Sequence, residues 1–155
     1  VQANALLQID KTRISYQALH SEILYHTGKQ KKALAKLDSL LELNPDNHPL
    51  TMTYVNLLMD HKDYRQATSE LKKHTLLRRS DPSTWQKLSE SEGKAGNKVA
   101  MYQARAEFLY LTGQKNKALK QLKIALDITK DQYQTAARIE QRAREIANTS
   151  DSLEF

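Results

Sequence analysis

Apolar residues recur every three or four positions along most of the chain, which places them on single faces of successive helices. Two such faces between residues 14 and 43 are expected to pack against each other as a hairpin. The first is Tyr16, Leu19, Ile23 and Leu24, and the second is Ala33, Leu37, Leu40 and Leu41. No alternating pattern of the kind that predicts strands competes with these stripes. The pattern therefore predicts an all-α protein.

The hairpin pattern returns with a period of 34 residues. Gly28, Lys62 and Gly96 are each separated by 34 positions and fall at the turn between two helices. Ala33 and Ala67, also 34 apart, are small residues expected where paired helices cross closely. A unit of two amphipathic helices cannot bury its own apolar face, so such units stack on one another. The period therefore predicts an α-solenoid of antiparallel helix pairs.

Turn and capping residues divide the chain into about four repeats. Asn47 and Asp81 are expected to cap helices, and the later position of Pro82 within its unit predicts a longer connection there. After Gly96 the register slips by half a period, because the next glycine turn, Gly113, follows after 17 residues. The segment 99–111 is therefore expected to end one repeat and begin the next.

The expected parts begin with a fragment, because residues 3–9 resemble the last turns of a helix cut within a repeat of a longer protein. They are a truncated helix of a preceding repeat (1–13), repeat 1 (14–47), repeat 2 (48–82), repeat 3 (83–112), repeat 4 (99–130), a C-terminal capping helix (131–147) and a polar tail (148–155).

The same spacing predicts further core positions. In the second repeat these are Leu50, Tyr54, Leu57, Leu58, Ala67, Leu71 and either Leu76 or Leu77. Asp131 is expected to cap the last helix, and Trp85 is interpreted as a packing anchor. The inner side of the last helix is expected to hold Tyr133, Ala136, Ala137, Ile139, Ala143 and Ile146.

Composition bears mainly on chemistry and partners. The chain has no cysteine, which excludes disulfides and thiolate metal sites, and no apolar run long enough to predict a membrane span. The net charge of +6 favours acidic partners without selecting among them.

Basic residues cluster at the helix turns: Lys29, Lys31, Lys32, Lys36, Lys62, Arg65, Lys94, Lys98, Lys115 and Lys117. They are interpreted first as a solvated exterior and second as a contact for an acidic protein or anionic lipid headgroups. Nucleic acid is not expected, because no aromatic residues interleave with them.

The sequence predicts no catalytic residue, metal ligand or cofactor site. A zinc peptidase helix needs two histidines four residues apart with a glutamate beside the first. No two of the five histidines, at 20, 26, 48, 61 and 74, have that spacing. Glycine is also too sparse for a phosphate-binding loop.

These positions resemble the tetratricopeptide repeat. In the first unit the matching residues are Leu24, Gly28, Ala33, Leu37 and Pro45, whereas the second unit departs at Lys62 and His74. The resemblance implies that the first helix of each unit lines a concave, protein-binding face. Projected onto this sequence, the positions are Leu19, Glu22, Tyr25, Met52, Thr53, Asn56, Met59, Gln86, Lys87, Glu90, Gln103, Glu107 and Tyr110. The same tyrosine and methionine positions are also compatible with packing between helices.

A second resemblance concerns the C-terminal half. The run QARAEFLYLTG at 103–113 and the later run ARIEQR at 137–142 are similar to the repeat region of bacterial periplasmic zinc metallopeptidases, the group of the β-barrel assembly-enhancing protease. The specific part spans Trp85 to Arg144. The resemblance implies a periplasmic location and a zinc-binding catalytic domain outside these residues.

The resemblance also implies partners: outer-membrane assembly machinery, unfolded barrel precursors, or the protease domain itself. The leading hypothesis is thus a non-catalytic docking domain. An intramolecular scaffold that covers or regulates the protease domain is one alternative. A homo-oligomerisation module with weak self-association is the other.

Overall fold

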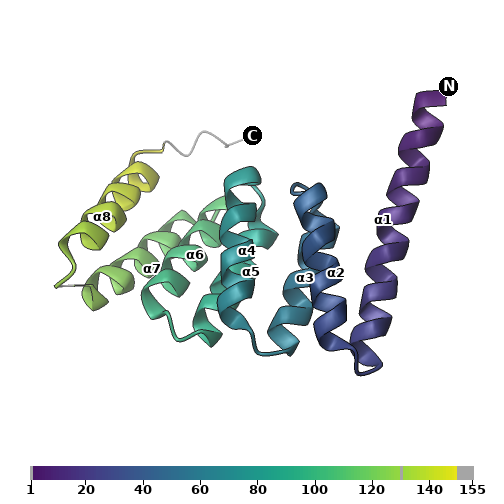
Figure 1. Cartoon of the computed structure of the whole chain (residues 1–155). Helices are drawn as coiled ribbons and strands as arrows, with labels where there is room; N and C mark the ends of the chain where they lie inside the picture. The colour runs from purple at the N-terminus through teal and green to yellow at the C-terminus, as the bar shows by residue number, and fades with distance from the viewer. Residues whose placement is uncertain (1, 130, 150–155) are drawn as a thin grey trace. The chain divides into compact units, whose positions relative to one another are not determined.

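The computed structural model describes residues 2–129 and 131–149, and all regular structure within these ranges is helical (Figure 1). The eight described helices are α1 (Gln2–His26), α2 (Gln30–Leu43), α3 (His48–Asp60), α4 (Tyr64–Leu77), α5 (Pro82–Lys94), α6 (Lys98–Leu111), α7 (Lys115–Ile128) and α8 (Tyr133–Asn148). The chain forms two compact units, Val1–Leu77 and Arg78–Phe155, which are described separately. The all-α prediction and the prediction of paired helices are confirmed.

Unit 1 consists of two antiparallel hairpins, α1 with α2 and α3 with α4, and α3 also packs against α1 and α2. Its core is aliphatic, with Leu37, Leu71 and Val55 fully buried. Ala33 and Ala67 are also fully buried, which confirms small residues at the helix crossings.

The predicted turns of both units share one hydrogen-bonding pattern at the end of the preceding helix. Gly28 and Gly96 have φ of 88° and 82°, and Lys62 takes the same left-handed conformation with φ of 63°. At the first turn, the amide of Gly28 donates to the carbonyl of Tyr25 and the amide of Lys29 donates to that of Leu24. This pair of bonds is the Schellman motif, which explains why the turn positions favour glycine.

Three predictions for unit 1 are wrong. The helix α1 is continuous through residue 13, so no helix boundary separates 1–13 from the first hairpin. Tyr16, Leu19 and Ile23 are 69%, 54% and 53% exposed, because α1 packs against α2 and α3 through a face that includes Ser21 and Tyr25. In the second helix pair, Leu76 and Leu77 are both exposed and the last turn of α4 buries His74 and Thr75 instead.

Unit 2 consists of α5 to α8, each packed on the next. Helix α6 packs against both α5 and α7, and Gly113 forms a turn with φ of 77°, in agreement with the half-period slip after Gly96. The core combines small and branched residues, with Ala118, Leu122 and Ile139 completely or almost completely buried.

Of the three residues predicted to cap helix N-termini, two do so in the structure. The Asn47 side chain accepts a hydrogen bond from the Leu50 amide, and Asp81 accepts one from the Ser83 amide, as predicted. Asp131 does not cap α8, because the helix begins one residue later than predicted and Gln132 occupies the N-cap position. The connection before Pro82 is not longer than the one before His48: both span four residues, since Pro82 stands inside the helix and not in the loop.

At the C-terminal end, Ile139 and Ile146 are buried as predicted, whereas Tyr133 is 86% exposed and Ala137 is exposed. Tyr133 occupies the first turn of α8. The predicted tail lies outside the described residues from position 150 onward.

Candidate protein-docking surface

In unit 1 the predicted contact residues lie on two packed helices, α1 and α3. They occur as pairs separated by the 34-residue period: Leu19 with Thr53, Glu22 with Asn56, and Tyr25 with Met59. Leu19 and Asn56 are exposed, whereas Glu22, Thr53 and the neighbouring Met52 are half-buried. Two successive repeats thus place different side chains, apolar, acidic and amide-bearing, at equivalent positions on neighbouring helices.

Tyr25 and Met59 are buried, at 8% and 6% exposed. The Tyr25 ring meets the rings of His26 and His61 edge-on, with centroids 5.4 and 6.3 Å away. Burial, with a smaller contribution from the Asp60 charge, raises the pKa of the Tyr25 hydroxyl. These two side chains therefore pack between helices, and the expectation that they contact a partner directly is corrected.

In unit 2, the predicted contact residues on α5 are held by neighbouring charges. The carboxylate of Glu90 accepts hydrogen bonds from Lys87 and Lys94, each at 3.1 Å. Partial burial raises the pKa of Glu90, but these two ammonium groups outweigh it and hold the value below the usual range. Gln86, on the same helix, is exposed.

Two of the three predicted contact residues on α6, Glu107 and Tyr110, are bound by Arg142 of α8. Arg142 Nε and Nη2 donate to the two carboxylate oxygens of Glu107, both at 2.7 Å, and the guanidinium carbon lies 5.3 Å from the centroid of the Tyr110 ring. The Tyr110 hydroxyl also donates to Thr149 Oγ1 at 3.3 Å. Gln103 is half-buried. Glu107 and Tyr110 thus help to attach α8, and their role as contact residues for a partner stays a prediction.

Sequence analysis missed Arg142, which is 35 residues from Glu107 and was assigned only to a capping helix. A signal was present, because Arg142 is the closing arginine of the run at 137–142. A planar, bidentate arginine–carboxylate pair is among the strongest polar contacts available to link two helices.

The described residues include no group of three or more side chains suited to hold a metal ion. Two of the five histidines lie together: His48 Nδ1 is 3.0 Å from His74 Nε2 and the rings are stacked. Of the predicted basic residues, Lys36 contacts His20 at 3.0 Å and Lys115 donates to the Thr149 carbonyl at 2.6 Å. No helix in the described residues is long and apolar enough to cross a membrane.

Stacked helix pairs with left-handed turns and small crossing residues define the tetratricopeptide-repeat class of α-solenoid. Residues 24–91 match a family model described as a tetratricopeptide repeat. Repeats of this class are protein–protein interaction modules. No curated protein matches the sequence.

The fold is also similar to solved structures of MamA. MamA 41-end from Desulfovibrio magneticus RS-1 is 19% identical with a TM-score of 0.54, over 90% of this chain and 78% of that one. A second, titled as the crystal structure of MamA protein, is 15% identical with a TM-score of 0.56, over 86% of each chain. At this identity the likeness concerns the fold alone. The resemblance to metallopeptidases stays a prediction.

Proposed function

We propose that this chain is a non-catalytic docking module that binds a polypeptide partner across α1 and α3 of unit 1. The observation that supports this is the paired placement of Leu19 with Thr53 and Glu22 with Asn56 on two neighbouring helices. An amide and a carboxylate at equivalent positions can bond to the main chain or side chains of a bound segment, and Leu19 and Met52 add apolar contact.

The proposed setting is the periplasm, in a protein that also carries a zinc metallopeptidase domain. Support comes from the runs at 103–113 and 137–142, which resemble the repeat region of that group. In this setting the partners are outer-membrane assembly proteins or unfolded barrel precursors. Zinc belongs to the catalytic domain, and this chain takes no cofactor.

Homo-oligomerisation is the second candidate, favoured by the exposed apolar stripe of Tyr16, Leu19 and Ile23 on α1. A bare apolar stripe on a helix is a common contact between copies of a repeat protein.

Photocrosslinking in living cells tests these proposals. A crosslinkable residue at Asn56, which is exposed on α3, is compared with one at Glu140, which is exposed on α8. Adducts with outer-membrane assembly proteins at Asn56 alone would support the docking proposal. Adducts with a protease domain would support an intramolecular scaffold, and adducts with a second copy would support oligomerisation. Equal labelling at the two positions would contradict a docking role for α1 and α3.

A further inference from the structure

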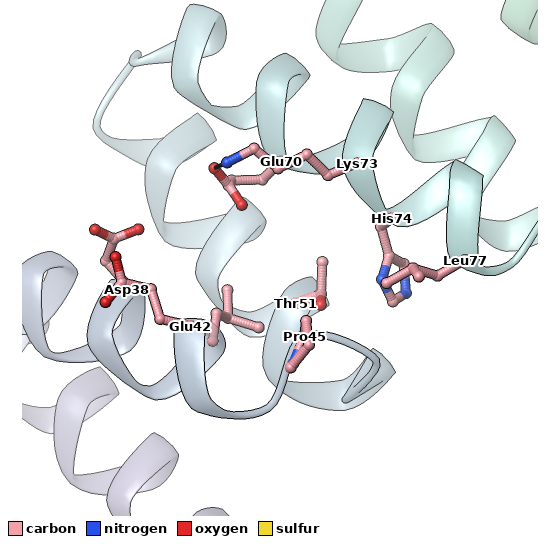
Figure 2. Close-up of a pocket in the computed structure, with 9 residues that line it drawn as sticks. Asp38, Glu42, Pro45, Thr51, Glu70, Lys73, His74 and Leu77 are labelled. Carbon is pink, nitrogen blue, oxygen red and sulfur yellow. Dashed lines mark hydrogen bonds and ion pairs between the residues drawn. The ribbon is translucent and has the colours of Figure 1, made fainter.

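A cleft of about 190 Å³ lies in unit 1 between α2 and α4. Figure 2 shows Asp38 and Glu42 on the α2 side, Glu70 and Lys73 on the α4 side, and Thr51 of α3 between them. None of the residues predicted for the concave face lines this cleft. It is therefore a separate surface from the one proposed above.

The cleft is acidic although the chain is basic. Its lining contains three carboxylates, from Asp38, Glu42 and Glu70, against the single ammonium group of Lys73, whereas the whole chain carries a net charge of +6. An acidic hollow on a basic molecule attracts cations locally and selects a partner by sign.

Part of this charge is already compensated. Glu70, whose side chain is 11% exposed, accepts hydrogen bonds from Lys73 Nζ at 2.8 Å and from Gln66 Nε2 at 3.1 Å. The hydrogen bond with Glu70 and its charge raise the pKa of Lys73, so the ammonium group stays charged at neutral pH. Lys73 thus neutralises Glu70, and the carboxylates of Asp38 and Glu42 carry the excess charge of the cleft.

The walls beside these carboxylates are apolar. Leu41, which is buried, lines the cleft, and Leu77, at the far end from Asp38 in Figure 2, is 55% exposed. Lysine and arginine side chains have this same division, with an aliphatic stem and a charged head. A guanidinium group suits the site well, because its planar donors match carboxylate oxygens.

We propose that the cleft between α2 and α4 binds an arginine or lysine side chain of a partner polypeptide, with an apolar neighbour of that residue packed on Leu77. The cleft would be a second contact site for a partner, beside the surface of α1 and α3. The proposal rests on the docking function only because it takes a polypeptide as the ligand. The head group contacts Glu42 and Asp38, and the stem lies along Leu41 and Pro45.

Selection from a random dodecapeptide phage library on the immobilised full chain tests the proposal. The expected peptides carry arginine or lysine next to leucine, isoleucine or methionine. The strongest peptide, synthesised with a fluorescent label, is expected to lose more than about tenfold in affinity for Glu42→Arg and about threefold for Glu42→Gln. Glu42 is exposed, so both variants are expected to retain the helical circular dichroism of the wild type.

Two further variants make the result specific. Glu140→Arg on α8 reverses an exposed carboxylate of unit 2 and is the control that is not expected to change binding of the peptide. Asn56→Arg reports whether the peptide binds the surface of α1 and α3 instead of the cleft. Three results would each overturn the proposal. They are selected peptides that lack a basic residue, a peptide that binds Glu42→Arg as tightly as the wild type, and a selection that enriches no peptide. Peptides lost only on Asn56→Arg would overturn it while leaving the docking function intact. A wild-type dimer that Glu42→Arg dissociates in sedimentation would assign the cleft to a second copy and overturn it as well.

Discussion

The two compact units are built from the same helix pairs, yet their terminal helices differ. In unit 1, α1 leaves Tyr16, Leu19 and Ile23 exposed. In unit 2, α8 buries Ile139 and Ile146 and joins α6 through Arg142. The exposed part of α1 thus includes three large apolar side chains, whereas α8 is held to its neighbour by both apolar and polar contacts.

This difference separates an open surface from an occupied one. Glu107 and Tyr110 on α6 are bound by Arg142 of α8, and Glu90 on α5 is bound by Lys87 and Lys94. The corresponding positions on α1 and α3 carry exposed Leu19 and Asn56. Glu90, Glu107 and Tyr110 are therefore engaged within unit 2, whereas Leu19 and Asn56 are exposed in unit 1.

The largest expected effect tests whether α1 is uncovered. Leu57 follows Ile23 by 34 residues, but Leu57 is 4% exposed and Ile23 is 53% exposed. Leu57→Ala is expected to lower the free energy of unfolding by about 2–5 kcal/mol, because it leaves a cavity. Ile23→Ala should change it by less than about 0.5 kcal/mol, as expected for an exposed side chain. Urea unfolding followed by circular dichroism measures both. A loss from Ile23→Ala close to that from Leu57→Ala would show that the stripe is covered.

The pair Ile23 and Leu57 also shows what sequence can predict. Periodicity identified both as apolar positions on helices, and the need for a left-handed turn identified Gly28 and Lys62, because these features depend on residues close in the chain. Burial of Leu57 depends on the neighbours of α3, which packs against α1, α2 and α4, whereas the main packing of the described part of α1 is on α2 and α3. The repeat pattern of the sequence does not predict which other helices pack against a given helix.

The candidate sites were less predictable for the same reason. The Arg142–Glu107 pair joins residues 35 positions apart on helices whose relative rotation no local pattern sets. The α2–α4 cleft brings together Asp38 and Glu70, which belong to different repeats. Positions on helix faces could thus be assigned from spacing, but contacts between faces could not.

The second expected effect concerns the attachment of α8. Arg142→Ala removes both hydrogen bonds to the half-buried carboxylate of Glu107 and the contact with the Tyr110 ring. A loss of about 1–3 kcal/mol in the free energy of unfolding of unit 2 is expected, reduced from a fully buried pair because Arg142 is partly exposed. Fluorescence of Trp85, the single tryptophan, reports on unit 2 during urea unfolding. The matched control is Arg144→Ala, an exposed arginine on the same helix, and an equal loss from that variant would contradict a special role for Arg142.

A smaller change in stability is expected at the left-handed turns, where one substitution should stabilise the protein and the other should destabilise it. Lys62 adopts φ of 63°, a conformation that glycine adopts at the equivalent turn of Gly96. Lys62→Gly is expected to stabilise unit 1 by about 0.5–1 kcal/mol, since relief of left-handed strain exceeds the entropy cost of glycine. Gly96→Ala is expected to destabilise unit 2 by about 1 kcal/mol, although no atom within 4 Å blocks a Cβ there. Thermal unfolding of both variants measures the difference, and destabilisation by Lys62→Gly would show that the lysine side chain contributes more than its backbone costs.

The smallest expected effect is a contrast in pH response. The pKa of Glu145 in unit 2 is lowered, first by its hydrogen bond from Arg142, so its stabilising contribution is present above the usual value of 4.5 and is lost as pH falls through the lowered pKa. The pKa of Lys73 in unit 1 is raised by Glu70, so its contribution to stability is complete below 10.5 and is lost as pH rises through the raised pKa.

Urea unfolding of the variants Glu145→Gln and Lys73→Met, across both pH ranges and against the wild type, tests this contrast. The urea midpoint of Glu145→Gln should depend less on pH in the acid range, and that of Lys73→Met should depend less on pH in the alkaline range. An unchanged acid limb in Glu145→Gln would assign the acid sensitivity of unit 2 to Glu90, whose pKa is also lowered by basic side chains.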